Sequence, residues 1–119
     1  MEASHDTVIR AQTQLQKAAL RLAEMAEAIA DAKQIKEYDS DRRKRALADV
    51  VAGLLEEGES AAAAEHKARA SKGYGDALSQ LSIQYREALR VIEKADAQRI
   101  LWESARSLLS VERAKIGML

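Results

Sequence analysis

The chain has 119 residues, with 19 basic and 19 acidic side chains, so its formal net charge is zero. This balance argues against a general polyanion-binding protein, and a nucleic-acid surface would have to be a local patch. Cysteine is absent, which excludes a disulfide framework and a thiolate zinc site. Alanine accounts for 24 residues, so the hydrophobic share of 47% overstates the bulky apolar surface, and a monomer would have a thin core.

The composition predicts an all-α fold. Proline and phenylalanine are absent, glycine occurs only five times, and good helix formers fill long stretches. We expect a single all-helical domain over residues 1–119, an elongated helical hairpin or bundle with coiled-coil heptad seams. Its helices are expected at about residues 7–37, 41–57, 60–72 and 76–116.

The first expected helix carries two seven-residue series of apolar side chains, offset by three residues. This spacing is that of a coiled-coil seam over four heptads. The two series are Val8, Leu15, Leu22 and Ile29, and Ala11, Ala18, Met25 and Ala32. Asp6 or Thr7 can cap the helix. The alanines allow close approach of a neighbouring helix, from this chain or from a second copy. We take the larger seam residues, Val8, Leu15, Leu22, Met25 and Ile29, as a predicted oligomer seam.

A polar run, Tyr38 to Asp41, reads as a break before the second helix, which should end at Gly58. The densest basic run follows this break, and consists of Arg42, Arg43, Lys44 and Arg45. It is either a solvated helix start or a binding site for nucleic acid or an acidic partner. Ser60 can cap a short alanine-rich third helix, and Gly73 to Gly75 reads as a hinge or turn, after which Asp76 caps the last helix.

The last expected helix changes character along one seam. Leu78, Tyr85 and Ile92 begin a seven-residue series that Arg99, Arg106 and Arg113 continue. The second series of this seam is Leu81, Ala88, Ala95, Trp102, Leu109 and Ile116. A heptad keeps one stripe of a helix towards one partner, so the stripe should turn from apolar to cationic. The residues of this helix assigned to the oligomer seam are Leu81, Tyr85 and Ile92.

Two interpretations of the arginine series remain open. The arginines can lay their methylene groups over apolar neighbours while pairing with carboxylates such as Glu103 and Glu112. They can instead bind phosphates or an acidic partner surface, with Trp102 stacking a base. Trp102 also suits the core of a helix interface, because it falls in the apolar series. The candidate binding residues are Arg42, Arg43, Lys44, Arg45, Arg99, Trp102, Arg106 and Arg113.

Enzymatic chemistry has little support in this sequence. The two histidines, His5 and His66, are far apart, and no motif places a nucleophile beside a base. We therefore expect a non-enzyme with no cofactor, no metal site and no small-molecule substrate. No apolar run approaches the length of about 20 residues that spans a bilayer, and the N-terminus lacks the pattern of a signal peptide, so we expect no membrane association and a cytoplasmic location.

Several short segments resemble small helical accessory proteins encoded in the early or recombination regions of tailed phages. These segments are Ala64 to Ser71, Tyr74, Trp102 to Arg106 and Ser110 to Arg113. The likeness covers about half of the chain and leaves out the N-terminal heptads. Phage proteins of this kind accompany single-strand annealing proteins or nucleases, and the resemblance implies the same neighbourhood here.

From these observations we expect a helical accessory or adaptor protein of phage-type DNA recombination or replication. It would form homo-oligomers through its heptad seams and contact single-stranded DNA or a DNA-processing protein, in the host cytoplasm if it is phage-encoded. The alternative is a coiled-coil scaffold or inhibitory module that binds a protein and never touches DNA.

Overall fold

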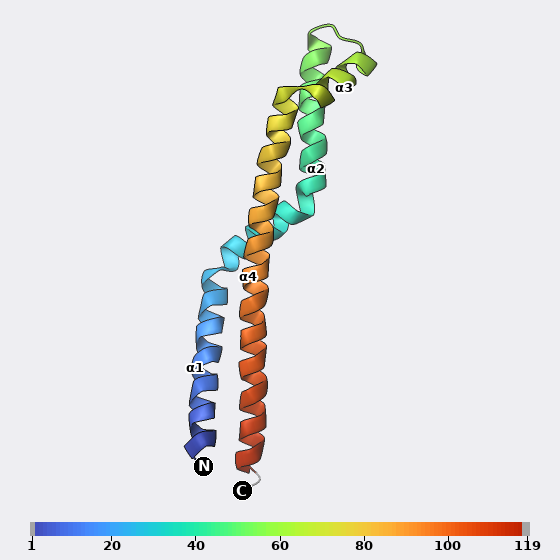
Figure 1. Cartoon of the computed structure of the whole chain (residues 1–119). Helices are drawn as coiled ribbons and strands as arrows, with labels where there is room; N and C mark the ends of the chain where they lie inside the picture. Colours follow the sequence, from blue (N-terminus) through green and yellow to red (C-terminus); the bar gives the residue numbers. More distant parts are fainter. Residues whose placement is uncertain (1, 118–119) are drawn as a thin grey trace. The chain divides into compact units, whose positions relative to one another are not determined.

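The computed structural model describes residues 2–117 and has four helices in this range, with no strand. Along the chain they are α1 (Glu2–Glu24), α2 (Ala26–Glu56), α3 (Ala61–Ala70) and α4 (Lys72–Gly117), as Figure 1 shows. The predicted all-α fold with a helical hairpin is confirmed. None of the helices in the described part combines the length and apolarity that a membrane span requires.

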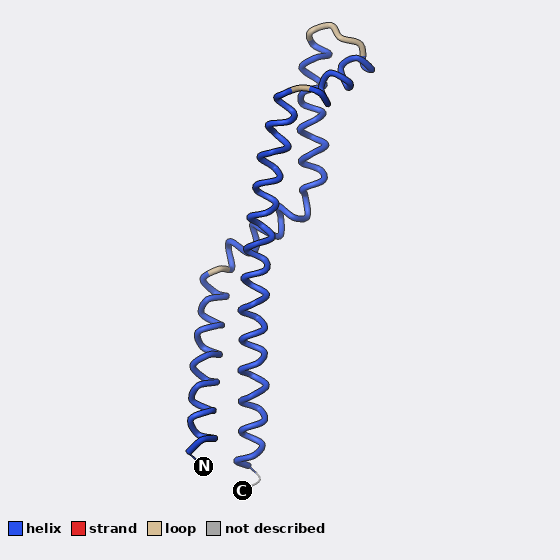
Figure 2. The backbone as a smooth tube through the Cα atoms, viewed as in Figure 1, coloured by secondary structure: helices blue, strands red, loops and turns tan. Residues whose placement is uncertain are grey.

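The helices form two compact units. The first unit contains the residues up to 30 and those from 91 onward, so α1 and the second part of α4 belong to it. The second unit contains residues 31–90, with most of α2, all of α3 and the first part of α4. Within the second unit, α2 and α4 run side by side in opposite directions and α3 lies at the end where they are joined (Figure 2).

The predicted break at Tyr38 to Asp41 is wrong, because α2 passes through these residues without interruption. Asp39 could have capped a new helix, but its carboxylate Oδ2 accepts a hydrogen bond from Nε of Arg43 at 2.9 Å. A pair four residues apart supports a continuing helix, so the cap-forming residue works inside the helix here.

The interruption of the first long helix falls at Met25 instead. Helical hydrogen bonds persist on both sides of it, from Met25 N to the carbonyl of Arg21 at 3.0 Å and from Ile29 N to the carbonyl of Met25 at 2.8 Å. The departure from helical geometry is therefore confined to one residue and no loop is present. The first helix also begins earlier than expected, at Glu2, so neither Asp6 nor Thr7 caps it.

Gly58 ends α2 as predicted. Its φ of +94° lies in the left-handed region, where a side chain is strained and glycine is favoured. The amide of Gly58 donates to the carbonyl of Leu55 at 3.1 Å, and that of Glu59 donates to the carbonyl of Leu54 at 3.2 Å. These two bonds form a Schellman motif, which satisfies carbonyls that the helix end would leave free. Ser60 then caps α3, accepting from the amide of Ala63 at 3.3 Å.

The predicted hinge at Gly73 to Gly75 is wrong, because both glycines lie in the first turn of α4. The turn is made by Ser71, which ends α3 and caps α4 at once. Its hydroxyl donates to the carbonyl of Ala68 at 2.7 Å and accepts from the amide of Tyr74 at 3.2 Å. Because α4 is already capped by Ser71, Asp76 is an ordinary helical residue.

The core consists almost entirely of alanine. The buried apolar residues of the described chain are Ala11, Ala18, Ile29, Ala32, Ala64, Ala68, Ala88, Ala95, Ala105 and Leu109. Larger seam residues such as Leu15, Leu22, Leu81 and Tyr85 are only half-buried. Small side chains let helices approach closely, but each alanine removes little apolar surface from water. The helices of each unit therefore pack tightly while burying little hydrophobic area.

The glycines of the turn region give a test of this backbone arrangement. A Cβ atom at Gly73 or Gly75 would meet nothing within 4 Å, and neither residue has a positive φ. Gly73→Ala and Gly75→Ala should each raise the free energy of unfolding by about 0.5–1 kcal/mol, because alanine favours a helix. Thermal unfolding followed by circular dichroism measures the change.

Gly58→Ala is the matched control, since it also faces open space but has the positive φ. This variant should lower the unfolding temperature. Destabilisation by alanine at Gly73 or Gly75 would contradict the helical start of α4 and restore the hinge at these residues.

Candidate binding edges of the first unit

The seam of α4 does not keep the seven-residue spacing on which the arginine series was placed. The buried and half-buried residues in the second part of α4 include Ile92, Ala95, Gln98, Trp102, Ala105, Leu109 and Glu112. In a regular seam, intervals of three and four residues alternate, but here Ile92, Ala95 and Gln98 are separated by two intervals of three. The first seam series therefore continues at Gln98, one residue before Arg99. The prediction that Arg99, Arg106 and Arg113 lie in the seam is therefore wrong; Gln98, Ala105 and Glu112 occupy it, and the arginines are exposed.

This displacement falls where the two units meet along α4. The second unit ends at residue 90 and the first unit resumes at residue 91, so α4 packs against α2 before this point and against α1 after it. Helical drift does not explain the change, because at about 100° per residue a straight helix brings Ala114, and not Glu112, back to the face of Leu78. The buried face of α4 is therefore set separately in each unit.

The displaced seam places two polar side chains in the interior of the first unit. Glu112 is 6% exposed, and its Oε1 accepts from Nζ of Lys115 at 3.3 Å. Its Oε2 and the Oε1 of Gln98 are buried with no hydrogen-bond partner among the described residues. Buried acceptors without donors cost about 1–3 kcal/mol each. These residues therefore weaken the pairing of α1 with α4.

The exposed arginines line one edge of the seam, which we call the arginine edge and define by Arg99, Arg106 and Arg113. Nη1 of Arg99 pairs with Oδ1 of Asp96 at 3.1 Å on the surface. The guanidinium of Arg106 lies over the ring of the half-buried Trp102, 5.4 Å from its centroid, which is a cation–π distance. Arg113 makes no ion pair with a described residue.

An open groove of about 480 Å³ accompanies the arginine edge. It is lined by Trp102 and Arg106 together with the polar residues Glu103, Ser107 and Ser110. The structure thus brings together the predicted binding residues Trp102 and Arg106, and places Arg99 and Arg113 one heptad to either side of Arg106. A flat ligand could stack on the indole while its negative charge faces the guanidinium groups.

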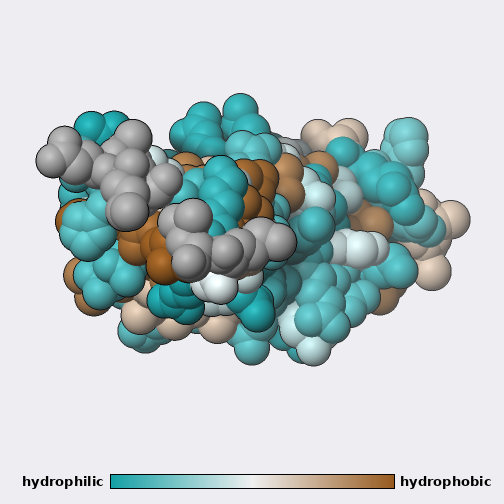
Figure 3. All heavy atoms as spheres, turned by 90° about the horizontal axis from the view of Figure 1, so that it is seen from below, coloured by the Kyte–Doolittle hydropathy of each residue, from teal (hydrophilic) through white to brown (hydrophobic). Residues whose placement is uncertain are grey.

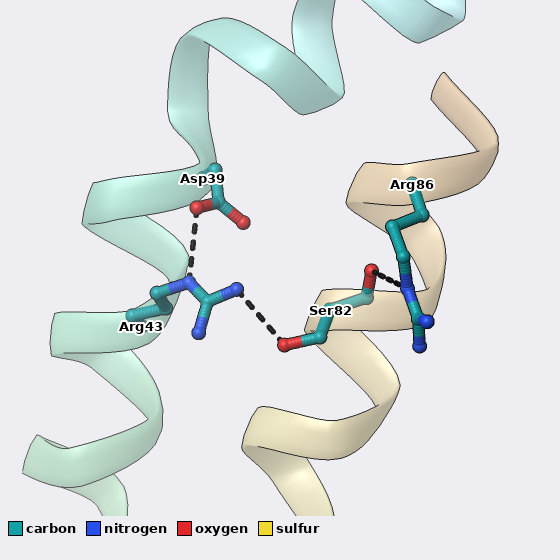
Figure 4. A network of polar contacts seen from close by, with 4 residues as sticks. All are labelled: Asp39, Arg43, Ser82 and Arg86. Atoms are coloured by element: carbon teal, nitrogen blue, oxygen red, sulfur yellow. Dashed lines mark hydrogen bonds and ion pairs between the residues drawn. The ribbon is translucent and has the colours of Figure 1, made fainter. Parts of the chain in front are cut away.

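The members of the other predicted basic run, Arg42 to Arg45, have different environments in the second unit. Arg43 points to α4, where its Nη2 donates to Oγ of Ser82 at 3.1 Å while its Nε pairs with Asp39 (Figure 4). Arg86, which lies on α4 like Ser82, has its Nε 3.5 Å from the Ser82 carbonyl four residues earlier (Figure 4). Arg43 is therefore a structural link between helices.

The remaining members of this run, Arg42, Lys44 and Arg45, are exposed and form no ion pair with a described residue. They lie within a continuous helix and not at its start, so they are not part of a helix N-terminus. Their role in binding stays a prediction. They belong to the second unit, whereas the arginine edge belongs to the first.

Sequence reasoning missed a second basic surface in the first unit. Arg10, Lys17 and Arg21 of α1 border an open groove of about 340 Å³ whose apolar lining includes Ile9, Ala18 and Leu101. These cations are spaced by seven and four residues, which keeps them on one face of α1. That spacing was available in the sequence, but only the structure shows that Leu101 of α4 completes the groove.

The two grooves lie at opposite edges of the α4 seam. Arg99 and Arg106 each come directly after a seam residue, Gln98 and Ala105. Leu101 and Leu108 each come directly before a seam residue, Trp102 and Leu109. With about 100° between successive residues, the two rows flank the seam on either side. We call the second edge the leucine edge.

The predicted oligomer-seam residues are all buried or half-buried. Val8, Leu15, Leu22 and Met25 are half-buried and Ile29 is buried, and Leu81, Tyr85 and Ile92 are half-buried. This burial agrees with their place in the seam between helices of one chain. Their contact with a second copy stays a prediction. No group of three or more metal-ligating side chains occurs among the side chains that the structure describes, those of residues 5–117.

Comparison with known proteins does not assign the chain to a family: no protein-family model, no curated protein and no solved structure matches it.

The buried carboxylate of Glu112 yields a prediction about stability. Glu112→Leu removes the unpartnered Oε2 and adds apolar surface to the seam, so it should raise the free energy of unfolding by about 1–2 kcal/mol. Urea unfolding followed by circular dichroism measures this change. Glu87→Leu is the control, because Glu87 is exposed in the same helix, and it should leave stability nearly unchanged. A loss of stability in Glu112→Leu would show that the seam needs the carboxylate.

Proposed function

We propose that this protein is a non-enzymatic helical adaptor of phage-type DNA recombination or replication, which self-associates and contacts DNA or a DNA-processing partner. The cytoplasm, in the host cell if the protein is phage-encoded, is the proposed location. The phage setting is supported by the resemblance of residues 64–71, Tyr74, residues 102–106 and residues 110–113 to small phage accessory proteins. The contact with an anionic partner is supported by the arginine edge.

The observation that carries the proposal is the exposed arginine edge beside a half-buried tryptophan. Arg99, Arg106 and Arg113 repeat at intervals of seven residues, or about 10.5 Å along the helix. Trp102 offers one face to Arg106 and lines an open groove. Cationic side chains next to an accessible aromatic ring are the combination by which proteins bind single-stranded nucleic acid without strong sequence preference.

Self-association is supported by the balance of buried and exposed apolar side chains. The described residues contain no bulky side chain that is fully buried, and the largest contributions to the core come from Ile29 and Leu109. Large hydrophobic side chains at the surface include Leu20, Leu55, Ile100, Leu108 and Val111. Figure 3 shows hydrophobic residues between hydrophilic ones on the visible surface. A second copy would cover part of this area.

A scaffold or inhibitory module without DNA contact is the second candidate. It is favoured by the zero net charge and by the same exposed apolar residues, which suit a protein partner. DNA binding separates the two candidates directly.

The arginine edge can be tested by measuring affinity for single-stranded and duplex DNA at several salt concentrations. Changing Arg99, Arg106 and Arg113 together to Gln should lower the affinity and reduce the salt slope by about 0.7–0.9 per lost phosphate contact. The control changes Lys33, Lys36 and Arg90 to Gln, which removes the same charge from exposed positions elsewhere. This control should keep most of the affinity and the slope.

Trp102→Leu distinguishes stacking from packing. A stacking tryptophan would lose DNA affinity while helix content and assembly remain, whereas a core tryptophan would lose stability first. We expect the loss of affinity, because one side of Trp102 is open to the groove. Absence of binding to either form of DNA at low salt would discard the DNA adaptor and leave the protein-binding scaffold.

A further inference from the structure

We propose that the basic groove at the leucine edge of the first unit receives the outward face of α4 from a second copy of this chain. The contact would bring Glu93, Asp96, Ile100 and Glu103 of one copy onto Arg10, Lys17 and Arg21 of the other. This inference rests on the self-association in the proposed function and assigns it a surface. Its cations are distinct from the arginine edge, whereas on the acidic face Glu103 also lines the groove of that edge and Asp96 pairs with Arg99. The groove residues Arg10 and Arg21 are therefore the ones that can be changed without altering the arginine edge.

The groove is suited to an acidic and apolar occupant. The side chains of Arg10, Lys17 and Arg21 are exposed and make no ion pair or hydrogen bond with a described residue. Between them the lining is largely apolar, with Ala18 of α1 and Leu101 of α4. Leu101 remains partly exposed in the single chain. A phosphate backbone would satisfy the cations but would leave this apolar lining in water.

The outward face of α4 has the complementary chemistry. Glu93, Asp96, Ile100 and Glu103 follow one another at intervals of three, four and three residues, so they form one stripe on the side away from the seam. Ile100 is 63% exposed and is the most exposed of the large hydrophobic residues that the structure describes. Glu93 and Glu103 have no ion-pair partner among the described residues. Asp96 carries only the surface pair with Arg99.

The spacings match when the two helices run antiparallel. Arg10, Lys17 and Arg21 are separated by seven and four residues, and Glu103, Asp96 and Glu93 by seven and three. At about 1.5 Å per residue the outer charges are about 16.5 Å apart on α1 and about 15 Å apart on α4. The pairs are then Arg10 with Glu103, Lys17 with Asp96 and Arg21 with Glu93.

This register also places the apolar residues together. Ile100 lies three residues from Glu103, so it falls opposite the residues of α1 just after Arg10, over the groove. There Ile100 of the second copy would contact Leu101 of the first copy, and both side chains would be removed from water. In a parallel arrangement Ile100 would instead lie opposite Lys17, and Asp96 would lose its partner. The antiparallel register is therefore the one that satisfies both charge and burial.

The contact joins two different surfaces, a groove on one copy and a helix face on the next. Such a heterologous contact leaves a free groove at one end of every pair and a free acidic face at the other. Assembly can therefore continue beyond a dimer. It should also weaken as salt rises, because the charges are at the surface and are screened within about 10 Å at 0.1 M salt.

A charge-swap experiment tests the contact. One variant reverses the groove with Arg10→Glu and Arg21→Glu, and the other reverses the acidic face with Glu93→Lys and Glu103→Lys. Light scattering should show at least a tenfold weaker self-association for each variant alone, because like charges then meet. An equimolar mixture should recover assembly, since each reversed surface matches the reversed surface of the other variant and the native surfaces still match.

Circular dichroism of each variant confirms that the helices form before association is measured. If a reversed variant fails to fold, Arg10→Gln with Arg21→Gln and Glu93→Gln with Glu103→Gln remove the same charges, and both should weaken assembly and its salt dependence. Assembly unchanged in either variant, or no recovery in the mixture, would overturn the contact. A groove variant that loses DNA affinity while its assembly is unchanged would assign the groove to nucleic acid and also overturn it.

Light scattering of the wild-type protein distinguishes a failure of this contact from a failure of self-association as a whole. If the wild type self-associates and the swapped variants do so equally, only this contact fails and the self-associating adaptor stands. If the wild type is monomeric at all concentrations, self-association fails as a whole and the contact fails with it.

Discussion

Close packing of helices across alanine is the interaction on which each unit depends. Eight of the ten buried apolar residues in the described chain are alanines, spread over all four helices. Alanine costs no side-chain entropy in a helix and lets two backbones approach, so dispersion contacts between the helices are favourable. It removes little apolar surface from water, however, and the larger seam residues remain half-exposed. The same choice of residue that makes the helices pack closely therefore leaves apolar surface for another chain to cover.

The sequence predicts those features of the fold that depend on a local backbone need. Gly58 marks the end of α2 because its positive φ favours glycine, and Ser60 marks the start of α3 because its hydroxyl caps the helix. Helix starts were predicted at the wrong residues where a polar side chain has two possible hydrogen-bond partners. Asp39 pairs with Arg43 inside a helix and does not cap a new one, and Ser71 rather than Asp76 starts α4. The interruption at Met25 has no signal in the sequence, because methionine is a good helix former.

The candidate site shows a similar division between local pattern and packing. The seven-residue repeat of Arg99, Arg106 and Arg113 correctly predicts that they share one face. It does not predict which face, because the buried residues of α4 change near residue 91, where α4 passes from the second unit to the first. Gln98, Ala105 and Glu112 then fill the seam, and the arginines flank it. An arginine edge on one side and a basic groove on the other give the first unit two separate surfaces, as the proposed adaptor requires.

The proposed self-association is tested most directly by measuring the midpoint of thermal unfolding as a function of protein concentration. When folding and association are coupled, the midpoint rises with concentration because mass action favours the assembled state. We expect such a rise over the micromolar range, together with a particle mass above that of a 13.1 kDa chain. A midpoint independent of concentration, with a monomeric mass throughout, would show that the alanine-lined units are stable without a second copy and would contradict the self-associating adaptor.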